Sequence, residues 1–230
     1  MCISRTTFAV RAQSHALLLL ALGAASICSA SSITLGTDNG GNAFPFAGPS
    51  SGVSGTEYQE AYASSDFSGP ISITGIDFFQ QVITPGADLY AATYELSLSV
   101  VTTNINDLSD TNFASNLGAD NTVFTTVALA GAAPDTLTFS GGAFNYDPSM
   151  GNLLLDIQIS DGNGSEVNSF FEDGDGSGPA GIIRYTNFGG GTTGYGLVTE
   201  FDSASASPEP GTLILLGCAL ASLFVRRRRA

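Results

Sequence analysis

The stretch Thr93-Tyr94-Glu95-Leu96-Ser97-Leu98-Ser99-Val100 decides the fold class, because its polarity alternates from one residue to the next. The four even-numbered residues are large and apolar, and the four odd-numbered ones carry a hydroxyl group or a carboxylate. Side chains of an extended chain point alternately to opposite faces, so this pattern predicts a β-strand with one buried and one exposed face. Such half-buried strands are typical of antiparallel sheets.

The same alternation recurs along the chain. Residues 153–159 repeat it, and weaker strand candidates cover residues 57–63, 71–79, 123–129, 136–140, 181–186 and 195–201. Turn-forming residues separate the candidates, at Ser68-Gly69-Pro70, Pro85-Gly86, Gly141-Gly142, Asp147-Pro148 and Gly189-Gly190-Gly191. We find neither a helical stripe nor a long internal repeat in this part of the chain. The sequence therefore predicts an all-β ectodomain over residues 31–202, a single β-sandwich of the jelly-roll type.

Composition excludes several function classes for the middle of the chain. Residues 31–207 hold 20 of the 21 acidic residues and one of the seven basic ones, Arg184, which gives a formal charge of −19. Such a segment repels phosphate backbones, so we expect no nucleic-acid partner. The segment also has no Cys, His, Lys or Trp, which excludes disulfides, the usual zinc sites and imidazole-dependent nucleophiles. We expect a protein that is not an enzyme.

The N-terminus has the order of a secretory signal peptide. Arg5 and Arg11 precede the apolar run of residues 16–25, and small residues follow as far as Ala30. We expect a signal helix within residues 1–30 and cleavage by signal peptidase after Ala30. A lipoprotein signal ending at Cys28 is the alternative, and Ile27 disfavours it because a small residue is usual at that place.

The C-terminus has three parts in a fixed order. A small polar linker of residues 203–207 leads to the tripeptide Pro208, Glu209 and Pro210, then to the apolar residues 213–225. The chain closes with the four basic residues Arg226, Arg227, Arg228 and Arg229 before Ala230. Thirteen helical residues span about 20 Å, less than the roughly 30 Å of a hydrocarbon core, so this transmembrane helix would be a weak anchor. The arginines would stay cytoplasmic and leave the ectodomain outside.

Residues 208–230 resemble the PEP-CTERM sorting signal, which is also labelled the C-terminal domain of ice-binding proteins. The resemblance implies export in a Gram-negative bacterium, transient anchoring in the inner membrane, processing by an exosortase-type membrane enzyme, and release to the cell surface or extracellular matrix. Gly211 departs from the serine that is common after the second proline. A looser resemblance, over residues 137–156, is to ectodomains that carry this tail, and it implies no activity.

One stretch of the ectodomain has the composition of a calcium loop. Calcium binds six to eight oxygen atoms, and Asp161, Asp173 and Asp175 lie in a segment rich in Gly, Asn and acidic residues. Neither possible frame completes an EF-hand, because Arg184 occupies the position of the required glutamate in one and Glu166 replaces the required glycine in the other. A solvated turn is the favoured interpretation, so we expect no cofactor, and a calcium site at this stretch is the alternative that stays open.

Other candidate groups have simpler explanations. Tyr58, Tyr62, Tyr185 and Tyr195 could stack on sugars, but tyrosines in strands more often pack in a core. Arg184 is expected to pair with a neighbouring carboxylate. We therefore expect a surface or matrix protein that meets extracellular polysaccharide. Two alternatives stay open: a glycoside hydrolase that works with carboxylates, and an adhesive module that binds calcium, carbohydrate or ice.

Overall fold

The computed structural model describes residues 31–48, 56–81, 87–163, 167, 171–174, 182–186 and 196–204. These residues belong to one compact unit, Ala30–Ser205. The predicted signal peptide and the predicted sorting tail lie outside the described residues. Within the described part of the chain, no helix has the length and apolar character needed to cross a membrane.

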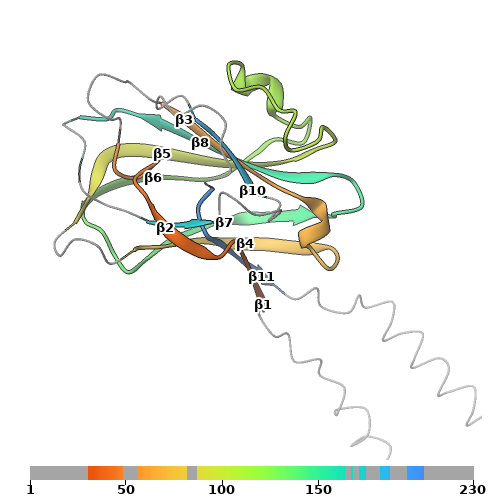
Figure 1. Cartoon of the computed structure of the whole chain (residues 1–230), viewed down its shortest axis with the longest axis horizontal. Helices are drawn as coiled ribbons and strands as arrows, with labels where there is room; N and C mark the ends of the chain where they lie inside the picture. Colours follow the sequence, from red (N-terminus) through yellow and green to blue (C-terminus); the bar gives the residue numbers. More distant parts are fainter. Residues whose placement is uncertain are drawn as a thin grey trace, which may run out of the picture. The chain divides into compact units, whose positions relative to one another are not determined.

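The described residues form two antiparallel sheets and a small two-stranded one (Figure 1). The four-stranded sheet has the order β1 (Ser31–Leu35), β11 (Thr199–Ala204), β4 (Ile71–Phe79) and β7 (Thr136–Tyr146). The five-stranded sheet has the order β10 (Ile182–Thr186), β3 (Glu57–Tyr62), β8 (Asn152–Ser160), β5 (Asp88–Val101) and β6 (Thr122–Ala132). The remaining pair joins β2 (Asp38–Asn42) to β9 (Phe171–Gly174). The fold is therefore all-β and sandwich-like, as the sequence predicts.

Aromatic side chains fill the space between the two large sheets. Phe46, in the loop after β2, has four rings around it whose centroids lie 5.0 to 5.7 Å away, on Phe78, Tyr94, Phe139 and Phe171. These rings come from both large sheets and from β9, and all five side chains are buried. Burying such large apolar surfaces supplies the main driving force for folding. Because this core lies within Ala30–Ser205, we expect that unit to fold on its own.

A second, smaller core lies on the outer face of the five-stranded sheet. The long connection between β5 and β6, residues 102–121, contains the short 3-10 helix η3 (Phe113–Asn116). Ile105, Leu108 and Phe113 from this connection pack with Ala61 of β3 and Leu154 of β8. The connection is the green segment above the sheet in Figure 1. We call it the β5–β6 excursion; it covers part of the outer face, while Gln158, a described residue of the same face, is exposed.

The two ends of the unit leave it side by side. Ser31 at the start of β1 pairs with Ser203 near the end of β11, and their hydroxyl oxygens lie 2.8 Å apart. β11 runs to Ala204, two residues into the segment that the sequence predicts as a linker. Ala204 in turn pairs with Ser72, at the start of β4. Both chain ends therefore lie at the end of the four-stranded sheet where β4 begins.

One predicted turn is wrong. Gly141 and Gly142 lie inside β7, where the pairing with β4 shifts register between Ile73 and Gly75. A β-carbon on Gly141 would come 2.3 Å from the carbonyl oxygen of Phe124. The glycine pair thus marks an irregular, closely packed point of a strand, which is another common use of glycine in sheets.

Candidate functional site

Three polar side chains form a row on the open part of the five-stranded sheet's outer face. The strand register places Glu57 of β3 beside Gln158 of β8, and Gln158 beside Glu95 of β5. The apolar neighbours of these residues, such as Leu96 and Ile157, point into the core, so the alternation of each strand turns the row outward. Two carboxylates therefore lie on either side of one amide.

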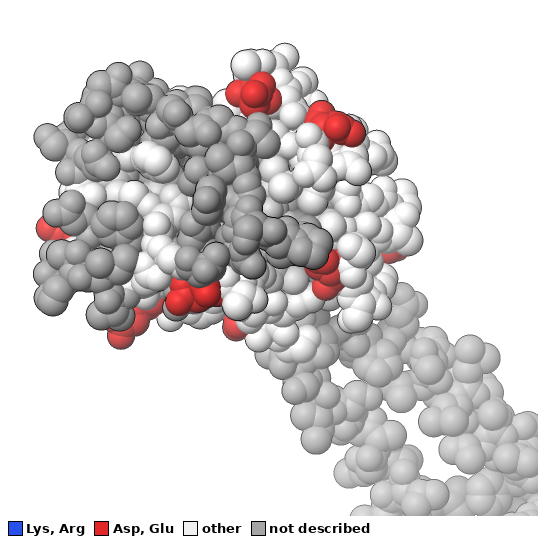
Figure 2. All heavy atoms as spheres, viewed as in Figure 1, with Lys and Arg blue, Asp and Glu red and all other residues white. Residues whose placement is uncertain are grey.

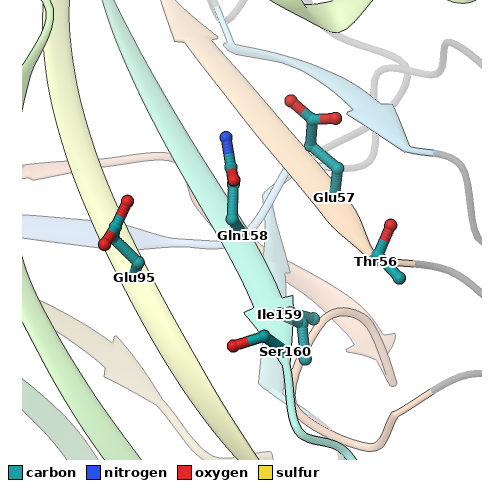
Figure 3. Close-up of a pocket in the computed structure, with 6 residues that line it drawn as sticks. All are labelled: Thr56, Glu57, Glu95, Gln158, Ile159 and Ser160. Atoms are coloured by element: carbon teal, nitrogen blue, oxygen red, sulfur yellow. The ribbon is translucent and has the colours of Figure 1, made fainter.

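This row forms the floor and walls of a cavity of about 200 Å³. Its lining residues are Thr56, Glu57, Glu95, Gln158, Ile159 and Ser160. Figure 3 shows Glu57 on one side, Glu95 on the other and Gln158 between them, all three extending from the same face of the sheet. The cavity is smaller than the roughly 300–1,000 Å³ of most drug-sized ligand sites, so it suits a small polar group.

A buried carboxyl group lies next to the cavity. Asp156, one step along β8 on the same face, is 2% exposed and accepts hydrogen bonds from the amides of Gln59 (2.9 Å) and Gln158 (3.3 Å). Burial raises its pKa above the usual range of an aspartate. Burial, the charge of Asp156 and a hydrogen bond to Asp156 together raise the pKa of Glu57 to about 7. Burial therefore favours the protonated form of both carboxyl groups, and the hydrogen bond between them couples their titrations.

A chain of amides ties this carboxyl pair to the β5–β6 excursion. Gln59 accepts a hydrogen bond from Asn116 of η3 (2.8 Å) and donates a longer one to the carbonyl oxygen of Phe113 (3.2 Å). Asn116 also binds both the N–H (2.7 Å) and the carbonyl oxygen (2.9 Å) of Ser109. The excursion is thereby held down on the sheet beside the cavity.

Another buried carboxyl group, that of Glu60, lies between the two large sheets. Glu60 of β3 is fully buried, and four groups donate to it: the hydroxyls of Tyr58, Tyr62 and Thr199 and the N–H of Leu197. Burial raises its pKa, although these hydrogen bonds oppose the shift. Arg184 is its register partner on β10. Because Glu60 connects β3 in one sheet with the start of β11 in the other, it acts as a buried polar connection between the sheets.

The outer face of the four-stranded sheet carries a second acidic group. Asp77 of β4 and Glu200 of β11 are register partners, and one carboxylate oxygen each from these two and from Asp202 lie within 4.8 Å of one another. Asp77 Oδ1 is buried without a hydrogen-bond partner, and burial and the two neighbouring carboxylates raise the pKa of Asp202. These three residues are the group among the described residues whose geometry could hold a metal ion.

The residues that the sequence singles out lie elsewhere. Asp161 is exposed in the bend after β8, with a φ of 53°, and Asp173 lies in β9; Asp175 is outside the described residues. The sorting residues Pro208, Glu209, Pro210 and Arg226, Arg227, Arg228 and Arg229 are also outside them. Tyr58, Tyr62 and Tyr185 are fully buried, so they pack in the cores and offer no ring to a sugar, while Tyr195 is outside the described residues.

The cavity residues are absent from the sequence-based candidates. Their outward direction could be read from the alternation around Glu95 and Gln158, but their proximity depends on the strand order β3-β8-β5. Comparisons with protein-family models, with curated proteins and with solved structures gave no match for the chain.

Proposed function

We propose that the chain is an exported, non-enzymatic surface or matrix protein of a Gram-negative bacterium, sorted through a PEP-CTERM tail. Signal peptidase removes residues 1–30, and an exosortase-type membrane enzyme acts on the tail after residues 213–225 have held the protein briefly in the inner membrane. The observation that supports this proposal is the position of the two ends. β1 begins at Ser31, so cleavage after Ala30 leaves the sheet intact, and Ser203 beside it carries the chain toward the tail.

The proposed sandwich is a jelly roll. Successive strands cross between the sheets, from β3 to β4, β4 to β5, β6 to β7 and β7 to β8, so that from β3 to β8 every pair of sequence neighbours except β5 and β6 lies in different layers. The strand orders β1-β11-β4-β7 and β3-β8-β5-β6 are those expected of two interlocked Greek keys, with β10 added at one edge.

The proposed partner is extracellular polysaccharide, and the face that meets it is the outer face of the five-stranded sheet. The connection from Tyr62 to Ile71 places the last residues of β3 and the first of β4 at one end of the sandwich, which is also the end where the chain enters and leaves. Glu57 and the cavity lie at the opposite end of β3. A domain tethered at one end would thus present the cavity at the other.

Fractionation in the native host tests the sorting proposal. The variant with Pro208→Ala, Glu209→Ala and Pro210→Ala should be exported and folded but stay unprocessed in the inner membrane, because the rigid extended segment that the processing enzyme reads is lost. A variant without residues 213–230 should instead be soluble in the periplasm. Intact mass and fractionation report both outcomes, and a triple variant that is processed like wild type would refute the proposal.

A carboxylate glycosidase is the second candidate, and the cavity favours it. Glu57 and Glu95 lie two strands apart, about 9.6 Å between strand axes, near the roughly 6.5–9.5 Å between carboxyl groups in inverting glycosidases. A pKa of about 7 suits Glu57 to protonate a leaving group. Release of reducing ends from host polysaccharide by the wild type, and its loss in Glu57→Gln, would establish this activity; no release excludes it for that substrate.

A further inference from the structure

The cavity beside Glu57 and Glu95 has the chemistry of a cation site. We propose that it binds the ammonium group of an amino sugar, presented by a polysaccharide whose sugars have lost their N-acetyl groups. This inference rests on the proposed contact with polysaccharide and specifies which polysaccharide would be bound.

The charge of the domain selects the class of polysaccharide. Residues 31–207 carry a formal charge of −19, and no cationic side chain is among those that the structure describes. On the face shown in Figure 2, the described charged residues are all acidic. An acidic polysaccharide would be repelled at short range, whereas a chain of ammonium groups would be attracted within the Debye length of about 8 Å at physiological ionic strength.

The hydrogen-bonding groups of the cavity match an amino sugar. An ammonium group has three donors and no acceptor, and the carboxyl oxygens of Glu57 and Glu95 offer acceptors from two sides. The hydroxyl groups of Thr56 and Ser160 and the amide of Gln158 both donate and accept, which suits the hydroxyl groups of a sugar ring. The glutamates would bind the ammonium group, and the hydroxyl and amide side chains would bind the hydroxyl groups of the sugar.

The same geometry disfavours two other cations. A bare divalent ion needs oxygen atoms that converge on one point, and the convergent carboxylate group is the one around Asp77, while Glu57, Glu95 and Asp156 do not form another. A lysine side chain would bring a four-carbon stem that prefers apolar walls. Ile159 is the one apolar residue in the lining.

The titratable groups near the cavity come from three adjacent strands. Glu57 of β3 is coupled to Asp156 of β8 through a hydrogen bond, and Glu95 of β5 accepts a long hydrogen bond from the neutral Thr126 of β6 (3.4 Å). Arg184 of β10 occupies a register position opposite the inward-facing Glu60. At pH 6, below its pKa of about 7, Glu57 is mostly protonated, so Glu95 should provide a large part of the attraction.

Calorimetric titration of the unit 31–205 at pH 6, where an amino sugar is protonated, tests the proposal. Glucosamine should bind at least about tenfold more tightly than glucose or N-acetylglucosamine, which have the same ring without the charge. Glu95→Gln should weaken glucosamine binding about tenfold, the value of one charged hydrogen bond. Asp135→Asn, the same charge change on the exposed turn between β6 and β7, should leave it unchanged. Equal binding of glucose and glucosamine, or an undiminished affinity in Glu95→Gln, overturns the inference.

Titrations with two other cations test whether the cavity binds a different ligand. If propylammonium binds as tightly as glucosamine, the cavity is a general ammonium site and the amino-sugar assignment is wrong. If calcium binds and Glu95→Gln abolishes its heat, the cavity is a metal site and the assignment is wrong as well. A melting curve for each variant shows that the protein titrated is folded.

The full chain in its host separates this inference from the proposed function. If the wild type reaches the matrix and Glu95→Gln is retained there equally well, the amino-sugar site fails and the sorting proposal stands. If the wild type is never processed or exported, the sorting proposal fails, and the titration of the isolated unit still decides the chemistry of the cavity.

Discussion

Glu60 shows how a single carboxylate can be tolerated inside an aromatic core. Its oxygens accept hydrogen bonds from Tyr58, Tyr62, Leu197 and Thr199, so each of these buried donors has a partner because Glu60 is there. A buried polar network of this kind is stable when it is complete and unfavourable when one member is removed. The sequence alone gives no sign of it, since an isolated glutamate in the alternation of residues 57–63 could equally be an exposed side chain on an edge.

Removing this side chain should therefore destabilise the domain strongly. Glu60→Ala leaves three or four buried donors unpaired and should lower the free energy of unfolding by about 3–5 kcal/mol. Glu60→Gln keeps one acceptor oxygen and adds an amide that Thr199 and Tyr62 can accept, so it should lose only about 1–2 kcal/mol. Urea unfolding of the unit 31–205 at pH 7 measures both. Equal losses in the two variants would mean that the hydrogen bonds of Glu60 contribute little.

Removing a carboxylate from the acidic group on the four-stranded sheet should stabilise the domain, in contrast to the removal of Glu60. Asp202→Asn removes one of three negative charges near Asp77 and Glu200, so we expect the free energy of unfolding to rise by about 0.5–1 kcal/mol at low salt. In 1 M NaCl the gain should shrink, because the Debye length falls to about 3 Å. Asp110→Asn, on the exposed part of the β5–β6 excursion, is the matched control and should have little effect. A loss of stability in Asp202→Asn at both salt concentrations would contradict repulsion as the dominant effect.

At the scale of the elements, β7 offers two adjacent glycines in different surroundings. A β-carbon on Gly141 would lie 2.3 Å from the carbonyl oxygen of Phe124 and 2.7 Å from its ring, whereas nothing lies within 4 Å of one on Gly142. Gly141→Ala should therefore push β7 away from β6 and lower the free energy of unfolding by about 1–3 kcal/mol. Gly142→Ala is the control and should stay within about 0.5 kcal/mol of wild type. Chemical unfolding of both variants checks this, and equal effects would mean that the close approach to Phe124 is not rigid.

The sequence predicts elements where alternation is strong and misses those that depend on a partner. Residues 71–79 form β4 as predicted, and residues 93–100 form the C-terminal part of β5. The segment Asp38–Asn42 consists of Asp, Asn and Gly and is typical of a loop, yet it forms β2 because β9 pairs with it. The cavity was missed for the same reason, since Glu57 and Glu95 are 38 positions apart and meet only through the order of β3, β8 and β5. Local patterns contain no information about such long-range order.

At the scale of the whole molecule, the protonation of the carboxyl groups is coupled to folding. Burial raises the pKa of five carboxyl groups, those of Glu57, Glu60, Asp66, Asp156 and Asp202. A lowered pKa is found for Asp147, whose side chain accepts a hydrogen bond from Ser149. The folded state therefore holds protons at a pH where the unfolded chain has released them.

These raised pKa values predict that the domain becomes more stable as the pH falls from 8 to about 5. A carboxyl group whose folded pKa is raised stabilises the fold fully below its unfolded pKa, and that contribution is lost as the pH rises through the folded value. For Glu57 the window runs from 4.5 to about 7. A shift of that size corresponds to about 3 kcal/mol, and solvent screening of this half-buried group reduces the expected gain to about 1–2 kcal/mol.

Urea unfolding of the unit 31–205 at pH 8, 7, 6 and 5 measures how the free energy of unfolding changes with pH. Glu57→Gln should flatten this dependence, because the glutamine amide does not titrate in this range. A wild-type stability that is constant, or that falls on acidification above pH 5, would contradict the raised pKa of Glu57.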